Sequence, residues 1–277
     1  MSALKPIRLR SYACVLLLAS ALLLSTGCLT TEGGKQFNII STQQEMELGR
    51  KMAEQLEREE KLLDDKVIQE YVSEIGQRLA RHSPRTDVPY QFKVIDEDET
   101  INAFAMPGGY MYVYTGLLRM CDNEAQLASV MGHEIAHVAS YHYGERATRI
   151  IGYQLIANII SGGSSATSAQ LAAKYLPVFT ELTFSRAQER EADRMGMDFL
   201  FRAGYKPESM VDFMGKLLEH ERESGAPRRL AFMSSHPATA NRVADLQVLM
   251  EQYPVSLRNQ NQTYADRYRT HVLNRLK

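Results

Sequence analysis

The stretch His133-Glu134-Ile135-Ala136-His137 decides how the rest of this 277-residue chain is interpreted. In an α-helix, residues four apart lie one turn above each other on the same face, so both imidazoles can reach one metal ion. The glutamate beside the first histidine can then reach a water molecule on that metal. HExxH on a helix is typical of zinc sites that activate water. The sequence therefore predicts a metal site; the alternative is a buried helix with two hydrogen-bonded histidines.

The residues around this motif favour a helix over about residues 123–138. Asp122 or Asn123 can cap its start, because a side-chain oxygen there accepts hydrogen bonds from the free N–H groups of the first turn. An apolar side suitable for burial is formed by Leu127, Val130, Met131 and Val138.

A catalytic zinc site needs a third protein ligand, which we expect from another element. The best candidate segment is SRAQEREADR at residues 185–194, which begins a second helical stretch that stops at Gly204. Glu189 and Asp193 extend the small and apolar face of that helix, whereas Glu191 points toward solvent. We therefore predict Glu189 as the ligand and Asp193 as the carboxylate that accepts the N–H of a ligand histidine. The alternative is an ordinary charged helix face with Glu–Arg pairs.

The two motifs together resemble a known family. HEIAHV followed about fifty residues later by SRAQEREAD is similar to the zinc metallopeptidase family of HtpX, the CAAX prenyl protease and BepA/LoiP. Three further stretches agree: INAFAMPGG at 101–109, AGYKP at 203–207 and SSHPATANR at 234–242. The resemblance covers about residues 41–250. It is closest to the short LoiP-like periplasmic lipoproteins, because the chain has no array of helical repeats.

This resemblance implies a mainly helical α+β, zincin-like metallopeptidase domain with a small β-sheet beside the HExxH helix. It implies one Zn²⁺ per chain, bound by His133, His137 and Glu189, with Glu134 as the general base, and it supports Asp193 behind a ligand histidine.

The resemblance also implies roles for His236 and Arg242 near the scissile carbonyl, where either side chain can stabilise an oxyanion. In BepA-like relatives the matching histidine can instead occupy the open zinc position. A histidine that caps a helix is the structural alternative, since Pro237 suits a first helical turn.

A hairpin is predicted where residues 101–106 and 110–115 flank Pro107-Gly108-Gly109. By resemblance, its first strand is an active-site edge, at which an extended peptide can be held by backbone hydrogen bonds. The expected substrate-binding residues are Asn102, Ala103, Phe104 and Ala105. The alternative is an ordinary hairpin strand. Further upstream, Thr42 to Glu45 matches a capping box.

The N-terminus has the pattern of a secretory signal. Basic residues precede an apolar run from Ala13 to Leu24, and Leu24-Ser25-Thr26-Gly27-Cys28 resembles a lipobox. That resemblance implies cleavage before Cys28 and lipidation of its sulfur and amino group. Leu29 at the next position favours outer-membrane delivery. The alternative is an uncleaved anchor helix, although the apolar run is short for a membrane span.

Charge and cysteine content limit the partners. The formal net charge is −1, and removal of the basic leader makes it more negative, which argues against nucleic acid as a partner. Once Cys14 has left with the leader and Cys28 is lipidated, Cys121 has no partner for a disulfide.

We therefore predict four segments: a lipoprotein signal peptide (1–27), a lipidated tether (28–40), a zinc metallopeptidase domain (41–253) and a polar C-terminal tail (254–277). Residues 150–180 can be core or a lid. The predicted function is a lipid-anchored periplasmic zinc endopeptidase at the outer membrane that cleaves misfolded or misassembled envelope proteins. The alternative is a non-proteolytic outer-membrane assembly factor or chaperone with a plugged or structural zinc site.

Overall fold

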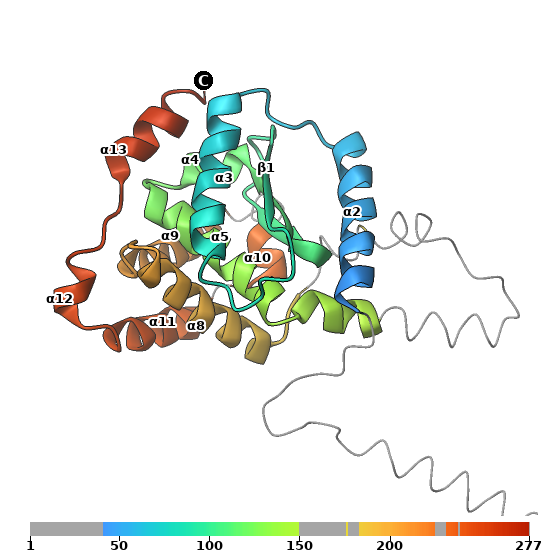
Figure 1. Cartoon of the computed structure of the whole chain (residues 1–277). Coiled ribbons are helices and arrows are strands. Elements are labelled where there is room, and N and C mark those ends of the chain that lie inside the picture. Colours follow the sequence, from blue (N-terminus) through green and yellow to red (C-terminus); the bar gives the residue numbers. More distant parts are fainter. Residues whose placement is uncertain (1–40, 150–175, 177–182, 225–230, 238, 277) are drawn as a thin grey trace, which may run out of the picture. The chain divides into compact units, whose positions relative to one another are not determined.

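The computed structural model describes residues 41–149, 176, 183–224, 231–237 and 239–276 (Figure 1). The predictions for the leader, the tether and Cys28 lie outside the described residues. Apart from Leu176, the same holds for residues 150–180, which the sequence leaves as either core or a lid. Among the helices that the structure describes, none is both long and apolar enough to cross a bilayer.

Two amphipathic helices begin the described chain, α2 (Thr42–Glu59) and α3 (Lys66–Ala80). The capping box of α2 is formed by Ser41 and Gln44, one residue before the position that the sequence predicted. The reason is that Glu45 is buried and paired with Arg85, whose two terminal nitrogens lie 3.0 and 2.7 Å from its carboxylate oxygens.

A mixed sheet of three strands follows, with the order β1-β3-β2. Strand β1 (Gln91–Ile95) is parallel to β3 (Tyr110–Tyr114), and β2 (Ala103–Met106) is antiparallel to β3. The 3₁₀ turn η1 (Pro107–Gly109) joins β2 to β3, and both of its glycines have positive φ, 77° and 85°. The hairpin prediction is thus confirmed, and within the part of the chain that the structure describes β2 pairs with β3 alone.

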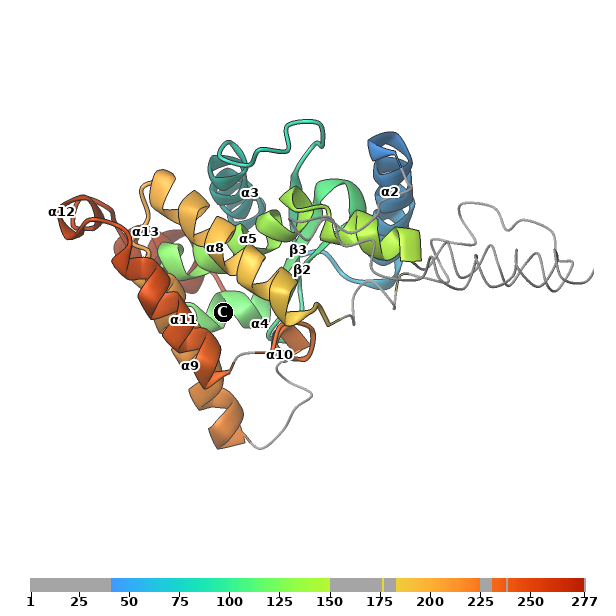
Figure 2. The same cartoon turned by 90° about the horizontal axis from the view of Figure 1, so that it is seen from below.

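The two helices that carry the sequence motifs pack against each other behind this sheet (Figures 1 and 2). Helix α5 (Glu124–Ala139) follows the short α4 (Thr115–Met120) and is buried along its whole length. Of the two caps that the sequence offered, Asn123 is the one that accepts a hydrogen bond from the first turn. Helix α5 meets α8 (Arg186–Arg202) where Gly132 faces Gly196. A Cβ on Gly196 would lie 2.9 Å from the backbone nitrogen of His133, so only glycine permits this close approach.

Further helices follow α8 in the chain. They are α9 (Glu208–Ser224), α10 (Ala231–Ser235), α11 (Ala240–Glu251), α12 (Val255–Arg258), α13 (Ala265–Tyr268) and the π-helical turn η3 (Arg269–Leu273). Of these, α11 packs against α8 and α9, α9 and α13 pack against α5, and η3 packs against α3 and α4. The fold is therefore α+β and mainly helical with a small sheet, as predicted.

The segment expected to be a polar tail packs against the domain. Tyr268 and Val272 are fully buried, and the Tyr268 hydroxyl donates to the carbonyl of Leu118 at 2.7 Å. The chain then returns to the start of α3, where Arg275 contacts Asp65 (Figure 1). The sequence did not predict this packing, because the few buried apolar residues are scattered over short helical turns in a segment of mainly polar composition.

Candidate metal centre

Four buried side chains from three parts of the fold meet at one point. His133 and His137 project from α5, Glu189 from the first turns of α8, and His236 directly follows α10. One nitrogen or carboxylate oxygen from each lies within 4.8 Å of the others. The helix geometry brings together the residues that the sequence predicted as ligands, and His236 joins them as a fourth.

The ligand atoms of this cluster are close enough together to surround one metal ion. Zinc–nitrogen bonds of about 2.0–2.1 Å put the ligand atoms of a tetrahedral site roughly 3.3 Å apart. The Nε2 atoms of His133 and His137 are 3.1 Å apart. Glu189 faces both with different oxygens, Oε2 at 3.5 Å from His133 Nε2 and Oε1 at 3.5 Å from His137 Nε2. His236 Nδ1 lies 3.2 Å from His133 Nε2 and 2.9 Å from Glu189 Oε1. Imidazole nitrogens with one carboxylate are a donor set that suits zinc.

The ligand histidine His133 contacts the carboxylate of Asp193, which is in turn paired with Arg242. Asp193 Oδ1 is 3.0 Å from His133 Nδ1, and Arg242 donates to both oxygens of Asp193 at 2.7 Å. The guanidinium also reaches Glu189 Oε2, at 2.8 Å. Burial opposes the charged form of Asp193, but these hydrogen bonds lower the pKa of its carboxyl. Burial likewise opposes the charged form of His133, while the neighbouring carboxylates raise the pKa of its imidazole to about 9.

The ligand histidine His137 contacts a further histidine, His142, for which the sequence predicted no role at the site. His142 Nδ1 lies 2.9 Å from His137 Nδ1, and its Nε2 is 3.5 Å from Glu191. Burial lowers the pKa of His142 to about 4, so the ring is neutral. Helical spacing puts His142 off the ligand face. However, α5 ends at Ala139, and Tyr141, with a φ of 61°, turns the chain back toward the cluster.

Glu134 is fully buried beside the cluster, with its two oxygens in different surroundings. Oε2 accepts hydrogen bonds from the backbone N–H of Ala105 and from the hydroxyl of Tyr143, both at 3.2 Å. Oε1 lies 3.2 Å from His236 Nε2. Burial, and then the Glu134 charge, raise the pKa of Tyr143 well above its ordinary value, so its hydroxyl keeps the proton. Tyr143 gave no signal in the sequence.

Strand β2 runs past this glutamate along the edge of the sheet. The carbonyl of Asn102 accepts a hydrogen bond from Tyr114 N–H, and Phe104 packs against the ring of Tyr112 at 5.6 Å. Of the four residues predicted at this edge, Ala105 is the one whose N–H reaches Glu134. One residue upstream of Asn102, the carbonyl of Ile101 accepts from Phe232 N–H of α10, the helix that carries His236.

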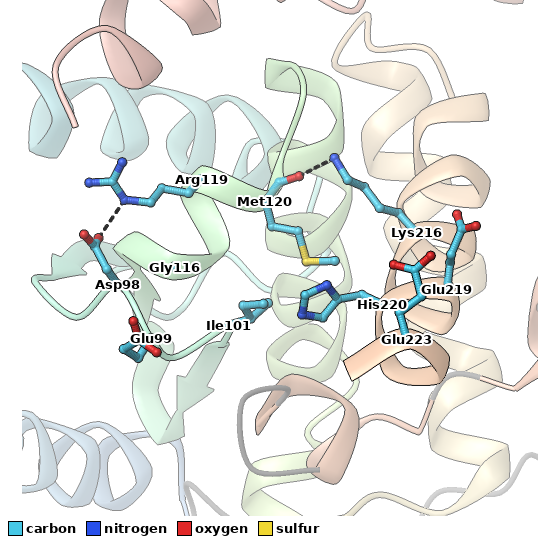
Figure 3. Close-up of a pocket in the computed structure, with 10 residues that line it drawn as sticks. All are labelled: Asp98, Glu99, Ile101, Gly116, Arg119, Met120, Lys216, Glu219, His220 and Glu223. Atoms are coloured by element: carbon cyan, nitrogen blue, oxygen red, sulfur yellow. Dashed lines mark hydrogen bonds and ion pairs between the residues drawn. The ribbon is translucent and has the colours of Figure 1, made fainter. Parts of the chain in front are cut away.

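Two cavities are open to solvent nearby. One, of about 560 Å³, includes Glu189, Arg242 and Phe184 in its wall and therefore adjoins the cluster. The other, of about 660 Å³, lies between α4 and α9 and shares no lining residue with the cluster (Figure 3).

A family model for Peptidase family M48 matches residues 67–250, which include the complete cluster. The chain belongs to this family. The family resemblance drawn from the HExxH and ExxxD motifs is thereby confirmed.

Curated relatives agree with this assignment. The chain is 31% identical to the beta-barrel assembly-enhancing protease of Escherichia coli (strain K12) over 256 residues, 89% of this chain and 52% of that protein. It is 31% identical to a putative beta-barrel assembly-enhancing protease of Vibrio cholerae over 227 residues, 78% of this chain and 46% of that protein. Against the mitochondrial metalloendopeptidase OMA1 of Schizosaccharomyces pombe it is 32% identical over 177 residues, 64% of this chain and 51% of that protein. The chain thus spans about half the length of the curated relatives it matches.

Proposed function

We propose that this protein is a zinc-dependent endopeptidase of the bacterial periplasm that cleaves misfolded or misassembled envelope proteins. The observation that carries the proposal is the cluster of His133, His137, Glu189 and His236, whose donor atoms all lie within 4.8 Å of one another, with Glu134 directly beside it. Membership of a peptidase family and the names of the relatives support it.

In the proposed mechanism His133, His137 and Glu189 hold the zinc ion, which when bound polarises a carbonyl and acidifies water. Glu134 takes the proton from the attacking water and delivers it to the leaving amine. Ala105 and Tyr143 fix Oε2 of this carboxylate, which leaves Oε1 to carry the proton. Asp193 fixes the tautomer of His133, as carboxylates behind ligand histidines do.

His236 and Arg242 were both expected near the scissile carbonyl. The contacts of Arg242 run to Asp193 and Glu189, which supports a role in holding the ligand carboxylates in place. His236 lies among the ligand atoms and beside the base, so a substrate must displace it before the carbonyl can approach. After displacement, its imidazole can donate to the oxyanion.

We propose that the peptide is bound as a strand added to β2, at Asn102 to Ala105. Binding through backbone groups reads no sequence and suits unfolded substrates. In the same proposal, Cys28 carries the lipid that anchors the protein to the outer membrane, close to the assembly machinery for which its relatives are named. Incorporation of a labelled fatty acid that disappears in Cys28→Ser tests the anchor.

One observation favours a second candidate function. With His236 the cluster offers four protein ligands, and a closed set of four is typical of structural zinc sites. A non-proteolytic assembly factor or chaperone with a plugged site would have this arrangement.

Cleavage of an unfolded protein by the zinc-loaded chain separates the two. We expect the parent to cleave and Glu134→Gln to be inactive at equal zinc content. If neither cleaves but His236→Ala does, the site is plugged and the base is competent. If the parent, Glu134→Gln and His236→Ala all lack activity yet function in cells, the assembly role replaces the peptidase.

A further inference from the structure

The cavity beside the metal centre is placed to receive part of a bound peptide. Its wall contains Glu189 of the cluster, and Phe184, whose ring stacks on that of His236 at a centroid distance of 5.3 Å. Because Glu189 belongs to both the cavity wall and the cluster, this space is within reach of a peptide held at the cluster.

The wall of this cavity has more basic than acidic side chains. Arg186 and Arg190 are exposed in the first two turns of α8, one turn apart. Among the residues that the structure describes, neither has a carboxylate within ion-pair distance. Arg242 is already held by Asp193 and Glu189. Apart from Glu189, the wall has one acidic residue, Asp245.

Both arginines stand where folding does not favour them. Arg186 is the first residue of α8, where a positive charge opposes the helix macrodipole. Like charges at i and i+4 repel each other across one helical turn. In the described chain no ion pair compensates either effect, so the placement of Arg186 and Arg190 is explained better by an anionic ligand than by stability of α8.

The larger cavity provides the contrast (Figure 3). There, Arg119 is paired with Asp98 at 2.9 Å, and Lys216 donates to the carbonyl of Met120 at 2.7 Å and to Asp122 at 2.6 Å. Its cations are therefore already engaged within the protein. Arg186 and Arg190, beside the metal centre, have no such partner among the described residues.

We propose that Arg186 and Arg190 form a subsite for a carboxylate of the substrate, close to the scissile bond. The inference rests on the proposed peptidase function and adds a preference for acidic substrates to it. Guanidinium groups bind carboxylates through two parallel hydrogen bonds, which gives the preference for arginine over lysine at such a site. The carboxylate belongs either to an Asp or Glu side chain or to the C-terminus of the substrate.

The test measures peptide binding, so that it does not depend on cleavage. The full-length, zinc-loaded protein in detergent carries Glu134→Gln, and ten-residue Ala/Ser peptides are titrated into it. One set is acetylated and amidated, with a single Glu or Gln moved along the sequence. A second set contains neither residue and has either a free or an amidated C-terminus.

We expect at least one position, or the free C-terminus, to bind about tenfold more tightly than its neutral match, as a charge-assisted hydrogen-bond pair allows. The ratio falls below about threefold in Arg186→Gln and in Arg190→Gln, and Arg190→Lys keeps part of it. Arg222→Gln is the matched control, because this arginine on α9 is 80% exposed and away from the cavity; it keeps the full ratio.

The proposal is overturned if no peptide is preferred over its neutral match, if no peptide binds, or if the preference survives in both glutamine variants. If the Glu134→Gln protein prefers the acidic peptides but the parent, with Glu134 intact, cleaves no peptide, the peptidase function is refuted and the subsite stands. Cleavage by the Glu134 form without any acidic preference would refute the subsite and leave the function in place.

Discussion

Replacing Tyr143 with phenylalanine removes one of the two donors that fix the proposed catalytic base. Its hydroxyl donates to Glu134 Oε2 at 3.2 Å, and the N–H of Ala105 donates to the same oxygen. The ring itself packs against Phe184 at a centroid distance of 5.4 Å and remains in the variant. Tyr143→Phe is therefore expected to loosen the carboxylate without opening a cavity.

The size of the effect follows from the hydrogen bond that is lost. A hydrogen bond to a charged group contributes about 1.5–3 kcal/mol. Because Ala105 continues to hold the same oxygen, the lower end applies, and about 1.4 kcal/mol corresponds to a tenfold change in rate. We expect kcat for peptide cleavage to fall roughly tenfold, with KM and zinc content unchanged, because Tyr143 acts on the base and on no ligand atom.

Tyr268→Phe is the matched control, since this tyrosine is equally buried and its hydroxyl donates to a carbonyl outside the site. Steady-state kinetics, bound zinc and thermal melting are measured on both variants. The reasoning fails if both lower kcat by the same factor, which would indicate a general loss of stability, or if Tyr143→Phe changes KM alone.

Three further predictions concern metal affinity, packing and acid stability. Asp193→Asn should weaken zinc binding by about 10- to 100-fold, because His133 loses its carboxylate partner; competition with a chelator measures this, and an unchanged affinity contradicts it. Gly196→Ala should lower the melting temperature and the zinc content together, since its Cβ would lie 2.9 Å from a backbone atom of α5; an unchanged melting curve would show that the two helices can separate. Burial opposes ionisation of Asp65, but hydrogen bonds from Arg275 and the backbone lower the pKa of its carboxyl below 3.8. The ionised carboxylate of Asp65 therefore stabilises the fold above pH 3.8, and this stabilisation is lost as the pH falls through the lowered pKa of the folded protein. Asp65→Asn should have a lower free energy of unfolding than the parent at neutral pH, and the two values should converge only in acid. Denaturation curves measured at several pH values test this.

The sequence was sufficient to predict the parts of the site that obey helical spacing. His133 and His137 are one turn apart on α5, and Glu189 and Asp193 are one turn apart on α8, so periodicity alone put each pair on one face. The caps at Asn123 and Ser185 support both helices.

The parts of the site that could not be predicted lie outside regular helical spacing. His142 and Tyr143 follow Tyr141, whose left-handed backbone lies just after the end of α5, so the 3.6-residue period no longer says where they point. The contacts of Arg242 with Asp193 and Glu189 join α11 to α8 and depend on how the two helices pack. Similarly, Tyr268 gave no signal in a polar segment, because a single anchor produces no period.

The contact of α5 with α8 at Gly132 and Gly196 has a consequence for how the protein acquires its metal. The backbones touch there with no side chains between them, so His133, His137 and Glu189 are held together by the fold itself. The conformational entropy of assembling these three donors is lost when the chain folds, before any ion arrives. A chelated protein should therefore stay folded and take up zinc again in a single association step, unlike small zinc domains that unfold without their ion.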